Sequence, residues 1–268
     1  MLNYPQINPV ILRLTEQLAV SWYSLAYFVG IMYGMHFSIW ASRRYNLGFE
    51  KKEIEDVFGF GILALIFFGR LGYVLFYGLN HYIVKPIDIV KTWEGGMSFH
   101  GGFLGVMIVS YIFCRIKKLN YLKLLDLVAV STPLGIMLGR IANFINAELY
   151  GRTTNSWIGM IFPTDPKFIP RHPSQLYESF LEGFVLFIIM NLMFFKFKKY
   201  NKTGFISSFF CIFYGLFRFI VEFFREPDVQ VGYIFKVFSM GQVLSISIVM
   251  IGVFIAVRFK IFKNGDKI

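Results

Sequence analysis

Seven long apolar stretches dominate the chain and restrict what it can fold into. They cover residues 19–40, 57–79, 98–116, 124–144, 175–195, 204–224 and 239–259. Crossing the hydrocarbon core of a bilayer takes roughly 20 apolar residues in a helix, and a helix satisfies its own backbone hydrogen bonds where water is absent. We therefore predict an all-α integral membrane protein with about seven transmembrane helices, arranged as a single polytopic membrane domain over residues 1–268.

The composition agrees, because 56% of the residues are hydrophobic and only 16% are charged, which leaves little material for a water-facing surface. The mean hydropathy is +0.58. The two cysteines, Cys114 and Cys211, fall within predicted helices and have no spacing that suggests a disulfide or a zinc site. We expect both to be buried apolar fillers, and we expect neither a metal nor a cofactor.

The net charge of +11 follows a regular pattern along the chain. Every second loop is rich in lysine and arginine, whereas the loops between them mix both signs. The basic positions are Arg43, Arg44, Lys51, Lys52, Arg115, Lys117, Lys118, Lys123, Lys196, Lys198, Lys199, Lys202, Arg258, Lys260, Lys263 and Lys267. Under the positive-inside rule these loops are cytoplasmic, so the N-terminus is predicted outside and the C-terminus in the cytoplasm. The charge thus requires no nucleic acid, and the first residues do not resemble a cleavable signal peptide.

Polar residues within the predicted helices fall at a single depth once the helices are oriented in this way. Charged groups in a membrane are costly and usually line a cavity or a functional site. The outer layer is predicted to contain Tyr23, Arg70, Tyr73, His100, Arg140, Asn143, Tyr177, Glu178, Arg218 and Glu222. We predict that they form one polar chamber open to the outer leaflet.

Arg218, Glu222 and Arg225 stand at helical spacing and should share one face. An internal ion pair near the interface is one interpretation, and a ligand site is the other. For Arg140 alone, snorkelling to the headgroups would be sufficient, but it explains less well why Arg70, Arg140 and Arg218 lie at similar depth. Because a guanidinium presents a planar fork of donors that matches phosphate oxygens, we favour a site for a phospholipid phosphate.

The motif GGMSFHGG, residues 95–102, places His100 between glycines at the start of the third predicted helix. Histidine is the side chain that exchanges protons most readily near neutral pH. A hydrogen-bonded structural histidine is an equal alternative. No two of the four histidines have the helical ligand spacing of a metal site.

Several motifs, taken in order, resemble those of one family. The segment GRIANFINAELYG, residues 139–151, is similar to the signature of the bacterial prolipoprotein diacylglyceryl transferases, and SWYSLAY, GRLGYVLFY, GGMSFHGG, RHPSQLYE and YGLFRFIVEFFREPD resemble the family's other motifs. The resemblance covers nearly the whole chain. It implies a seven-helix enzyme of the bacterial cytoplasmic membrane that transfers the diacylglyceryl group of phosphatidylglycerol to the lipobox cysteine of a prolipoprotein signal peptide. Glycerol phosphate is released, and the reaction is the first step of lipoprotein maturation.

The resemblance also implies site residues. Those expected to act in catalysis are Tyr23, His100, Arg140, Arg218 and Glu222. Those expected to bind phosphatidylglycerol are Arg70, Arg140, Asn143, Asn146, Glu148, Gly151 and Arg218, of which Arg70 is included for its depth alone.

One mechanism is consistent with both lines of reasoning. A thiolate is the competent nucleophile, and it would attack the glycerol carbon that bears the phosphate ester. Arg140 and Arg218 would stabilise the charge that grows on the phosphate oxygens. His100 would accept the thiol proton or orient the lipid. Residues 146–171 would form an external arm that holds the protein substrate, or else an ordinary solvated loop.

Two other functions compete with this interpretation. A transporter would bind a permeating anion with the same arginines, but it would need polar residues through the cytoplasmic half of the membrane, and residues 181–195 and 246–257 are nearly free of charge. A lipid-binding scaffold would tolerate loss of His100, whereas an enzyme that uses this imidazole would not.

Overall fold

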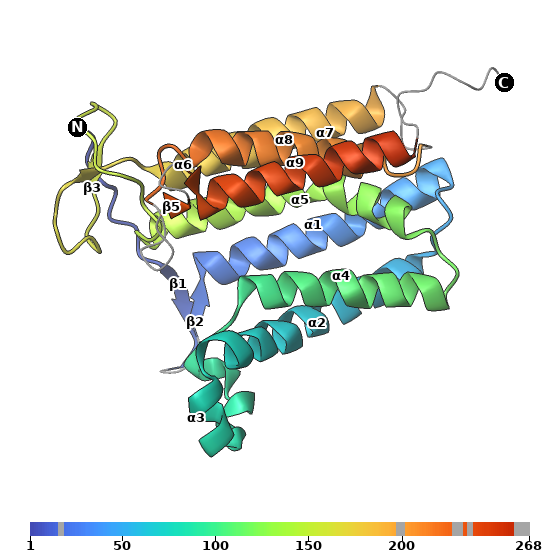
Figure 1. The fold of residues 1–268 in the computed structure, drawn as a ribbon, viewed down its shortest axis with the longest axis horizontal. Coiled ribbons are helices and arrows are strands. Elements are labelled where there is room, and N and C mark those ends of the chain that lie inside the picture. Colours follow the sequence, from blue (N-terminus) through green and yellow to red (C-terminus); the bar gives the residue numbers. More distant parts are fainter. Residues whose placement is uncertain (16–18, 197–201, 227–232, 235–237, 260–268) are drawn as a thin grey trace. The chain divides into compact units, whose positions relative to one another are not determined.

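The computed structural model describes residues 1–15, 19–196, 202–226, 233–234 and 238–259. The chain divides into two compact units, which we call the larger unit, Met1–Gly34 with Leu125–Ile268, and the smaller unit, Met35–Leu124. Helices dominate both units (Figure 1). Five residues of the predicted basic loops lie outside the described residues: Lys198, Lys199, Lys260, Lys263 and Lys267.

The smaller unit is built on two helices, and α1 (Trp22–Tyr45) enters it from the larger unit. Its elements are α2 (Lys51–Tyr77), α3 (Leu79–Val84), the 3-10 turns η1 (Pro86–Val90) and η2 (Thr92–Glu94), and α4 (Phe99–Ile116). The helix α2 begins at Lys51, before the predicted residue 57, because Glu50 and Glu53 form a capping box. A Cβ at Gly101 would collide with the Phe68 carbonyl, so the glycines of α4 allow α2 to approach closely.

The larger unit contains the remaining helices and three short strand pairs. The strands are β1 (Val10–Arg13), β2 (Ala19–Ser21), β3 (Met160–Ile161), β4 (Pro170–Arg171), β5 (Tyr233–Ile234) and β6 (Phe238–Ser239). The helices are α5 (Tyr121–Ile145), α6 (Ser174–Glu178), η3 (Ser179–Val185), α7 (Leu186–Phe195), α8 (Phe205–Val221) and α9 (Met240–Arg258). Residues 121–124, at the start of α5, belong to the smaller unit. The segments α6, η3 and α7 form one continuous helical run, in which η3 is a π-helix that the sequence pattern did not predict.

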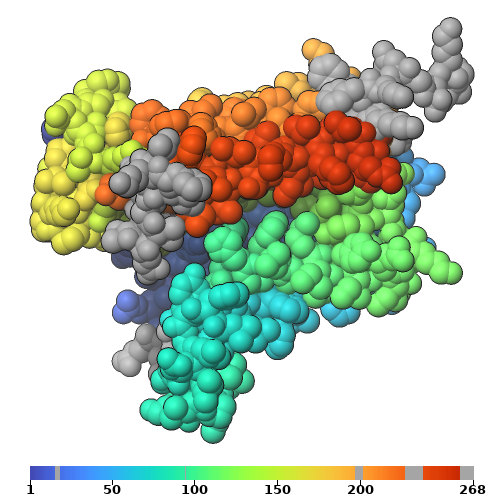
Figure 2. Space-filling view, viewed as in Figure 1, coloured from blue at the N-terminus to red at the C-terminus, as the bar shows by residue number. Residues whose placement is uncertain are grey.

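The predicted external arm, residues 146–171, is folded around a small core of its own. Phe162 is fully buried and belongs to a cluster with Phe144, Ala147 and Met160. The strands β3 and β4 pair antiparallel, and Thr153 pairs with Arg171. Figure 2 shows this segment in yellow-green, beyond the ends of α8 and α9. The segment is therefore ordered structure, and its contact with a protein substrate stays a prediction.

A buried ion pair stabilises this external segment. Arg171 Nε donates to Asp165 Oδ2 at 2.8 Å, and only 1% of Asp165 is exposed. The hydrogen bond from Arg171 holds the pKa of the Asp165 carboxyl below its ordinary value. Its stabilising contribution is therefore complete above the unfolded-state pKa of about 3.9, and it is lost as the pH falls through the lower folded-state pKa.

We expect Asp165→Asn to lower stability at neutral pH and to make stability less dependent on pH below about 4. Thermal unfolding of both proteins on either side of that pH, followed by circular dichroism, tests this. If wild type and variant lose stability in acid to the same extent, the pair contributes nothing.

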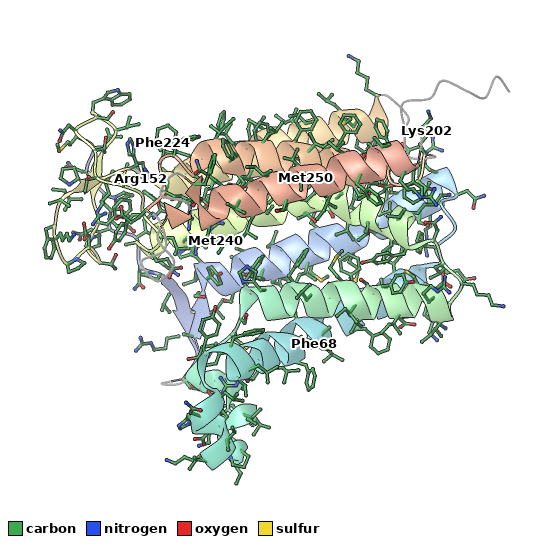
Figure 3. The ribbon with its side chains drawn as sticks, viewed as in Figure 1. Phe68, Arg152, Lys202, Phe224, Met240 and Met250 are labelled. Atoms are coloured by element: carbon green, nitrogen blue, oxygen red, sulfur yellow. The ribbon has the colours of Figure 1, made fainter. Side chains whose placement is uncertain are left out.

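Five helical segments of the described residues are long and apolar enough to cross a bilayer: α2, α4, α5, the run from α6 to α7, and α9. The helix α8 is apolar but has only 17 residues, and α1 lies where the first span was predicted. Only 22 to 39% of the residues in the five apolar windows are buried, and side chains project outward all along these helices (Figure 3). An apolar exterior of this kind is suited to lipid, so the chain is a multi-pass membrane protein, for which seven spans stay a prediction.

Candidate active site

The signature GRIANFINAELYG ends α5 and folds back on itself. Asn143 accepts a hydrogen bond from Arg140 (Nη1 to Oδ1, 3.4 Å) and donates one to Glu148 (Nδ2 to Oε1, 2.8 Å). Asn146 donates to the same Glu148 oxygen at 3.1 Å. Ala147 adopts a positive φ of 55°, which reverses the chain and brings the Glu148 carboxylate back to both amides. The polar residues of the signature thus form one hydrogen-bonded group.

Glu178 binds three arginines that come from α5, α8 and the turn after α8. It is fully buried at the end of α6. Its Oε2 lies 2.8 Å from Arg140 Nη2 and 3.4 Å from Arg218 Nη1, and its Oε1 lies 2.8 Å from Arg225 Nη1. We call these three arginines together with Glu178 the arginine cluster.

Glu222 connects two of these arginines a second time. Its Oε2 lies 2.6 Å from Arg218 Nη2 and 3.5 Å from Arg225 Nε, so the three residues are neighbours as predicted. The helix α8 ends at Val221, however, so Arg225 reaches Glu222 from the turn after the helix and not from a shared helical face. Ser239, the N-cap of α9, donates to Oε1 of Glu222 at 2.9 Å. A Cβ at Gly241 would collide with the carboxylate, so the start of α9 fits closely around Glu222.

The accessible part of this group of charges is cationic. The side chains of Arg140, Arg218 and Arg225 are 23%, 16% and 13% exposed, whereas Glu178 and Glu182 are fully buried. Glu182 lies 3.7 Å from Arg218. The arginines are thus the more accessible partners of these ion pairs, and guanidinium donors match phosphate oxygens. The exposed carboxylate of Glu148 lies nearby and is hydrogen-bonded to Asn143 and Asn146.

Tyr23 joins this part of the larger unit from the start of α1. Its hydroxyl lies 3.4 Å from that of Tyr27, and it interacts electrostatically with Arg140 and Glu148. The structure thus brings together seven of the residues that the sequence singled out, which are Tyr23, Arg140, Asn143, Asn146, Glu148, Arg218 and Glu222.

His100 and Arg70 belong to the smaller unit. His100 lies in the first turn of α4 with an exposed side chain, and its ring meets that of Phe99 edge-on at 5.7 Å. Arg70, which the sequence predicted to bind phosphate, is 5% exposed and donates to four backbone carbonyl oxygens. The sequence did not predict these partners.

Gly151 closes the signature against the end of α8. Its N–H donates to the His172 carbonyl at 2.8 Å, and it pairs with Arg225. The next residue, Arg152, donates its N–H to the Phe224 carbonyl at 2.9 Å, and Figure 3 shows these two residues at the same end of the helices. A Cβ at Gly151 would collide with the Phe224 carbonyl. Gly151 therefore provides close backbone packing beside Arg225.

We expect Gly151→Ala to destabilise the protein by about 1–3 kcal/mol, the usual result of overpacking. Gly139→Ala is a matched control, because Gly139 lies within α5 and an added Cβ would meet nothing within 4 Å. In a helix interior this control should be neutral or stabilising by up to about 1 kcal/mol. Unfolding temperatures measured side by side test the pair, and equal effects would contradict the close packing at Gly151.

Sequence reasoning placed Glu178 in the outer layer without giving it a role, and it overlooked Glu182. A signal was present, because the two glutamates stand four residues apart in the otherwise apolar stretch 176–187. Ionisable residues inside a span are functional candidates by default. The three arginine partners of Glu178, in contrast, depend on contacts between distant segments.

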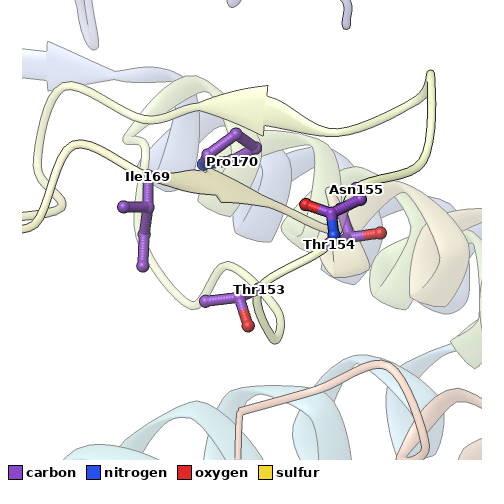
Figure 4. A pocket seen from close by; sticks show the side chains of 5 residues that line it. All are labelled: Thr153, Thr154, Asn155, Ile169 and Pro170. Atoms are coloured by element: carbon purple, nitrogen blue, oxygen red, sulfur yellow. The ribbon is translucent and has the colours of Figure 1, made fainter.

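The external segment contains a pocket of about 310 Å³ lined by Thr153, Thr154, Asn155, Ile169 and Pro170 (Figure 4). These residues offer hydroxyl, amide and apolar groups. They include no cation, so this pocket is chemically distinct from the arginine cluster.

Known proteins with similar sequences identify the family. The family model described as prolipoprotein diacylglyceryl transferase matches residues 9–258. A protein of Rickettsia felis named phosphatidylglycerol–prolipoprotein diacylglyceryl transferase is 51% identical over 251 residues, which cover 94% of this chain and 96% of the relative. A protein of the same name from Rickettsia bellii is 49% identical over 257 residues, which cover 96% and 97% of the two chains. With this similarity over nearly its whole length, the chain belongs to the prolipoprotein diacylglyceryl transferase family.

Proposed function

We propose that the arginine cluster binds the phosphate of phosphatidylglycerol while the diacylglyceryl group is transferred to a prolipoprotein cysteine. The observation that carries this proposal is the difference in exposure, with three partly exposed arginine side chains paired with the fully buried carboxylate of Glu178. Planar guanidinium donors match phosphate oxygens, and the low dielectric of a membrane site strengthens the attraction.

In the proposed reaction, the thiolate of the lipobox cysteine attacks the glycerol carbon that carries the phosphate ester. A carbon–sulfur bond forms and the carbon–oxygen bond to the phosphate breaks, so that glycerol phosphate leaves with the electron pair. Arg140 and Arg218 hold the phosphate and stabilise the charge that collects on its oxygens. His100 accepts the proton of the thiol.

The other site residues orient these groups. Asn143 links Arg140 to Glu148 through two hydrogen bonds, so it limits the rotation of the guanidinium. Glu222 limits the rotation of the Arg218 guanidinium in the same way, because its Oε2 lies 2.6 Å from Arg218 Nη2. Tyr23 and Asn146 are proposed to donate hydrogen bonds to lipid oxygens.

The proposed topology has seven spans, with α1 and α8 crossing in addition to the five long apolar segments. The N-terminus lies outside and the C-terminus in the cytoplasm of a bacterium, and the site faces the outer leaflet of its cytoplasmic membrane. The basic residues Arg43, Arg44 and Arg115, in the last turns of α1 and α4, support this orientation.

Both substrates would reach this site by diffusion within the membrane. The signal peptide of the prolipoprotein is proposed to bring the lipobox cysteine to the outer leaflet. The uncharged pocket of the external segment is proposed to receive the polypeptide beyond that cysteine, since threonine and asparagine side chains can hydrogen-bond an extended chain.

A mass assay on purified protein in detergent, with phosphatidylglycerol and a lipobox peptide, tests the function. The peptide should gain the mass of a diacylglyceryl group, and an otherwise identical peptide with serine in place of cysteine should gain nothing. If the wild-type protein is folded and no adduct forms with phosphatidylglycerol, the proposal fails. Anion flux into proteoliposomes would then indicate a transporter.

A further inference from the structure

We infer that Arg70 is a positioning residue for His100: it holds the backbone from which α4 starts and so fixes where the imidazole projects. All the contacts that carry this inference lie within the smaller unit. The inference rests on the proposed role of His100 as proton acceptor.

Arg70 gathers one irregular segment of chain around its guanidinium. Nε donates to the Ile89 carbonyl at 2.8 Å and Nη2 to the Asp88 carbonyl at 2.7 Å. Nη1 donates to the carbonyls of Gly95 at 2.5 Å and Gly96 at 3.1 Å. Four of the five N–H donors of a guanidinium are thereby used, and the side chain is only 5% exposed. A phosphate would have to displace these carbonyls to reach it.

Arginine suits this position better than any other side chain. Carbonyl oxygens that converge from several directions create a negative potential, which a buried cation neutralises. The guanidinium carbon also lies 5.2 Å from the ring centre of Tyr82 and 5.9 Å from that of Tyr73, within cation–π distance. Lysine has a more compact head with three donors, so it cannot bond all four carbonyls.

The segment held by Arg70 leads directly into α4. Gly95 and Gly96 have φ values of 86° and 79°, which glycine adopts without strain. Two residues later, Ser98 N donates to the Gly69 carbonyl at 2.8 Å, and the Ser98 hydroxyl caps α4 by accepting from Gly101 N at 3.3 Å. Gly69 precedes Arg70 on α2, so two neighbouring residues of α2 fix the start of α4.

His100 is the second residue of α4, so its position follows from this attachment. If the carbonyls of Gly95 and Gly96 lost their common donor, the cap at Ser98 would be held by Gly69 alone. A displacement of about 1 Å in a catalytic group can lower a rate by roughly 100-fold. Loss of Arg70 should therefore impair turnover through the histidine and leave lipid binding intact.

The test compares Arg70→Lys, His100→Ala and the double variant in the lipid–peptide transfer assay. Arg70→Lys should lower kcat by about 10- to 100-fold and change the KM for phosphatidylglycerol by less than about twofold. In the His100→Ala background the same change should alter kcat by less than about twofold, because its effect passes through the imidazole. Arg115→Met is the control and should match wild type, because Arg115 is exposed in the last turn of α4, far along that helix from His100.

Two results would overturn the inference. A raised KM with unchanged kcat would mean that Arg70 contacts the lipid. An equal loss of kcat in both backgrounds would mean that Arg70 supports the fold in general and not His100 in particular. If Arg70→Lys does not elute as a folded protein, Tyr82→Leu replaces it. This variant removes one cation–π contact and keeps all four hydrogen bonds, so kcat should fall by only about 2- to 5-fold. The KM should again be unchanged, and the loss should again be absent in the His100→Ala background.

A second measurement is independent of catalysis. The rate at which diethyl pyrocarbonate modifies His100 in lipid-free protein, followed by mass spectrometry, should change several-fold in the Arg70 variant and stay constant in Arg115→Met. An unchanged rate would overturn the inference. Wild-type protein could fail to transfer a diacylglyceryl group to the peptide while the rate of His100 modification still changes in the Arg70 variant. The proposed function would then have failed, and the positioning of His100 by Arg70 would not.

Discussion

Arg140→Ala is expected to lower kcat/KM for diacylglyceryl transfer by roughly 100- to 1,000-fold, the usual cost of removing one donor aimed at developing charge. Arg140 has the most exposed side chain of the three arginines in the arginine cluster and is oriented by both Glu178 and Asn143. Arg140→Lys should lie between wild type and the alanine variant, because it keeps the charge and loses the planar fork.

The transfer assay measures these rates, with Arg43→Ala as the control. Arg43 is exposed in the last turn of α1 and should be dispensable. If Arg140→Lys is as active as wild type, charge alone is sufficient and bidentate recognition of phosphate is wrong. If Arg140→Ala keeps most of its activity, the arginine cluster is not the phosphate site.

Glu178→Gln is expected to destabilise the protein by about 3–5 kcal/mol, the range found when one partner of a buried ion pair is removed. The carboxylate is fully buried and lies within 3.4 Å of all three arginines. Without its charge, the three guanidiniums would repel one another, and among the described residues Glu222 and Glu182 would be the carboxylates left within 4 Å of them. We expect activity to be lost as well, because Arg140 and Arg218 would no longer be held together.

Glu226→Gln provides a matched comparison. Glu226 also pairs with an arginine, Arg171, at 3.2 Å, but it is 49% exposed. Pairs of this kind contribute less than about 1 kcal/mol, so this variant should unfold close to wild type. Thermal unfolding in the same detergent at one scan rate compares the two. Shifts of equal size would show that burial does not determine the strength of these pairs.

The helices could be predicted because their signal is local. The stretch predicted at 239–259 is α9, Met240–Arg258, and the pairing of Arg218 with Glu222 follows from a spacing of four residues. A helix that crosses lipid needs a long run of apolar residues, and side chains three or four residues apart lie on one face of a helix. Both kinds of information are present in a short window of sequence.

The partners of Glu178 and Arg70 could not be predicted for two different reasons. Glu178 reaches Arg218 and Arg225 across 40 and 47 residues of sequence, and only the packing of α6 against α8 brings them together. Arg70 binds main-chain carbonyls, which every residue possesses, so the amino-acid sequence does not indicate which residues are its partners. The core around Phe162 was missed because the Gly, Pro, Thr and Asn content of residues 146–171 predicted an external arm or a solvated loop, neither with a core of its own.

The π-helical turn Ser179–Val185 makes the length of this segment as important as its composition. A π turn accommodates one residue more than an α turn, and one residue corresponds to about 100° of rotation around a helix. The backbone of Gly183 lies against Met137, one turn before Arg140 on α5, and no side chain fits between them. If a single residue were deleted from this turn, even an exposed one such as Phe180, Gly183 could stay against α5 only if Glu178 rotated away from the arginines. Insertions and deletions should therefore be excluded from this turn.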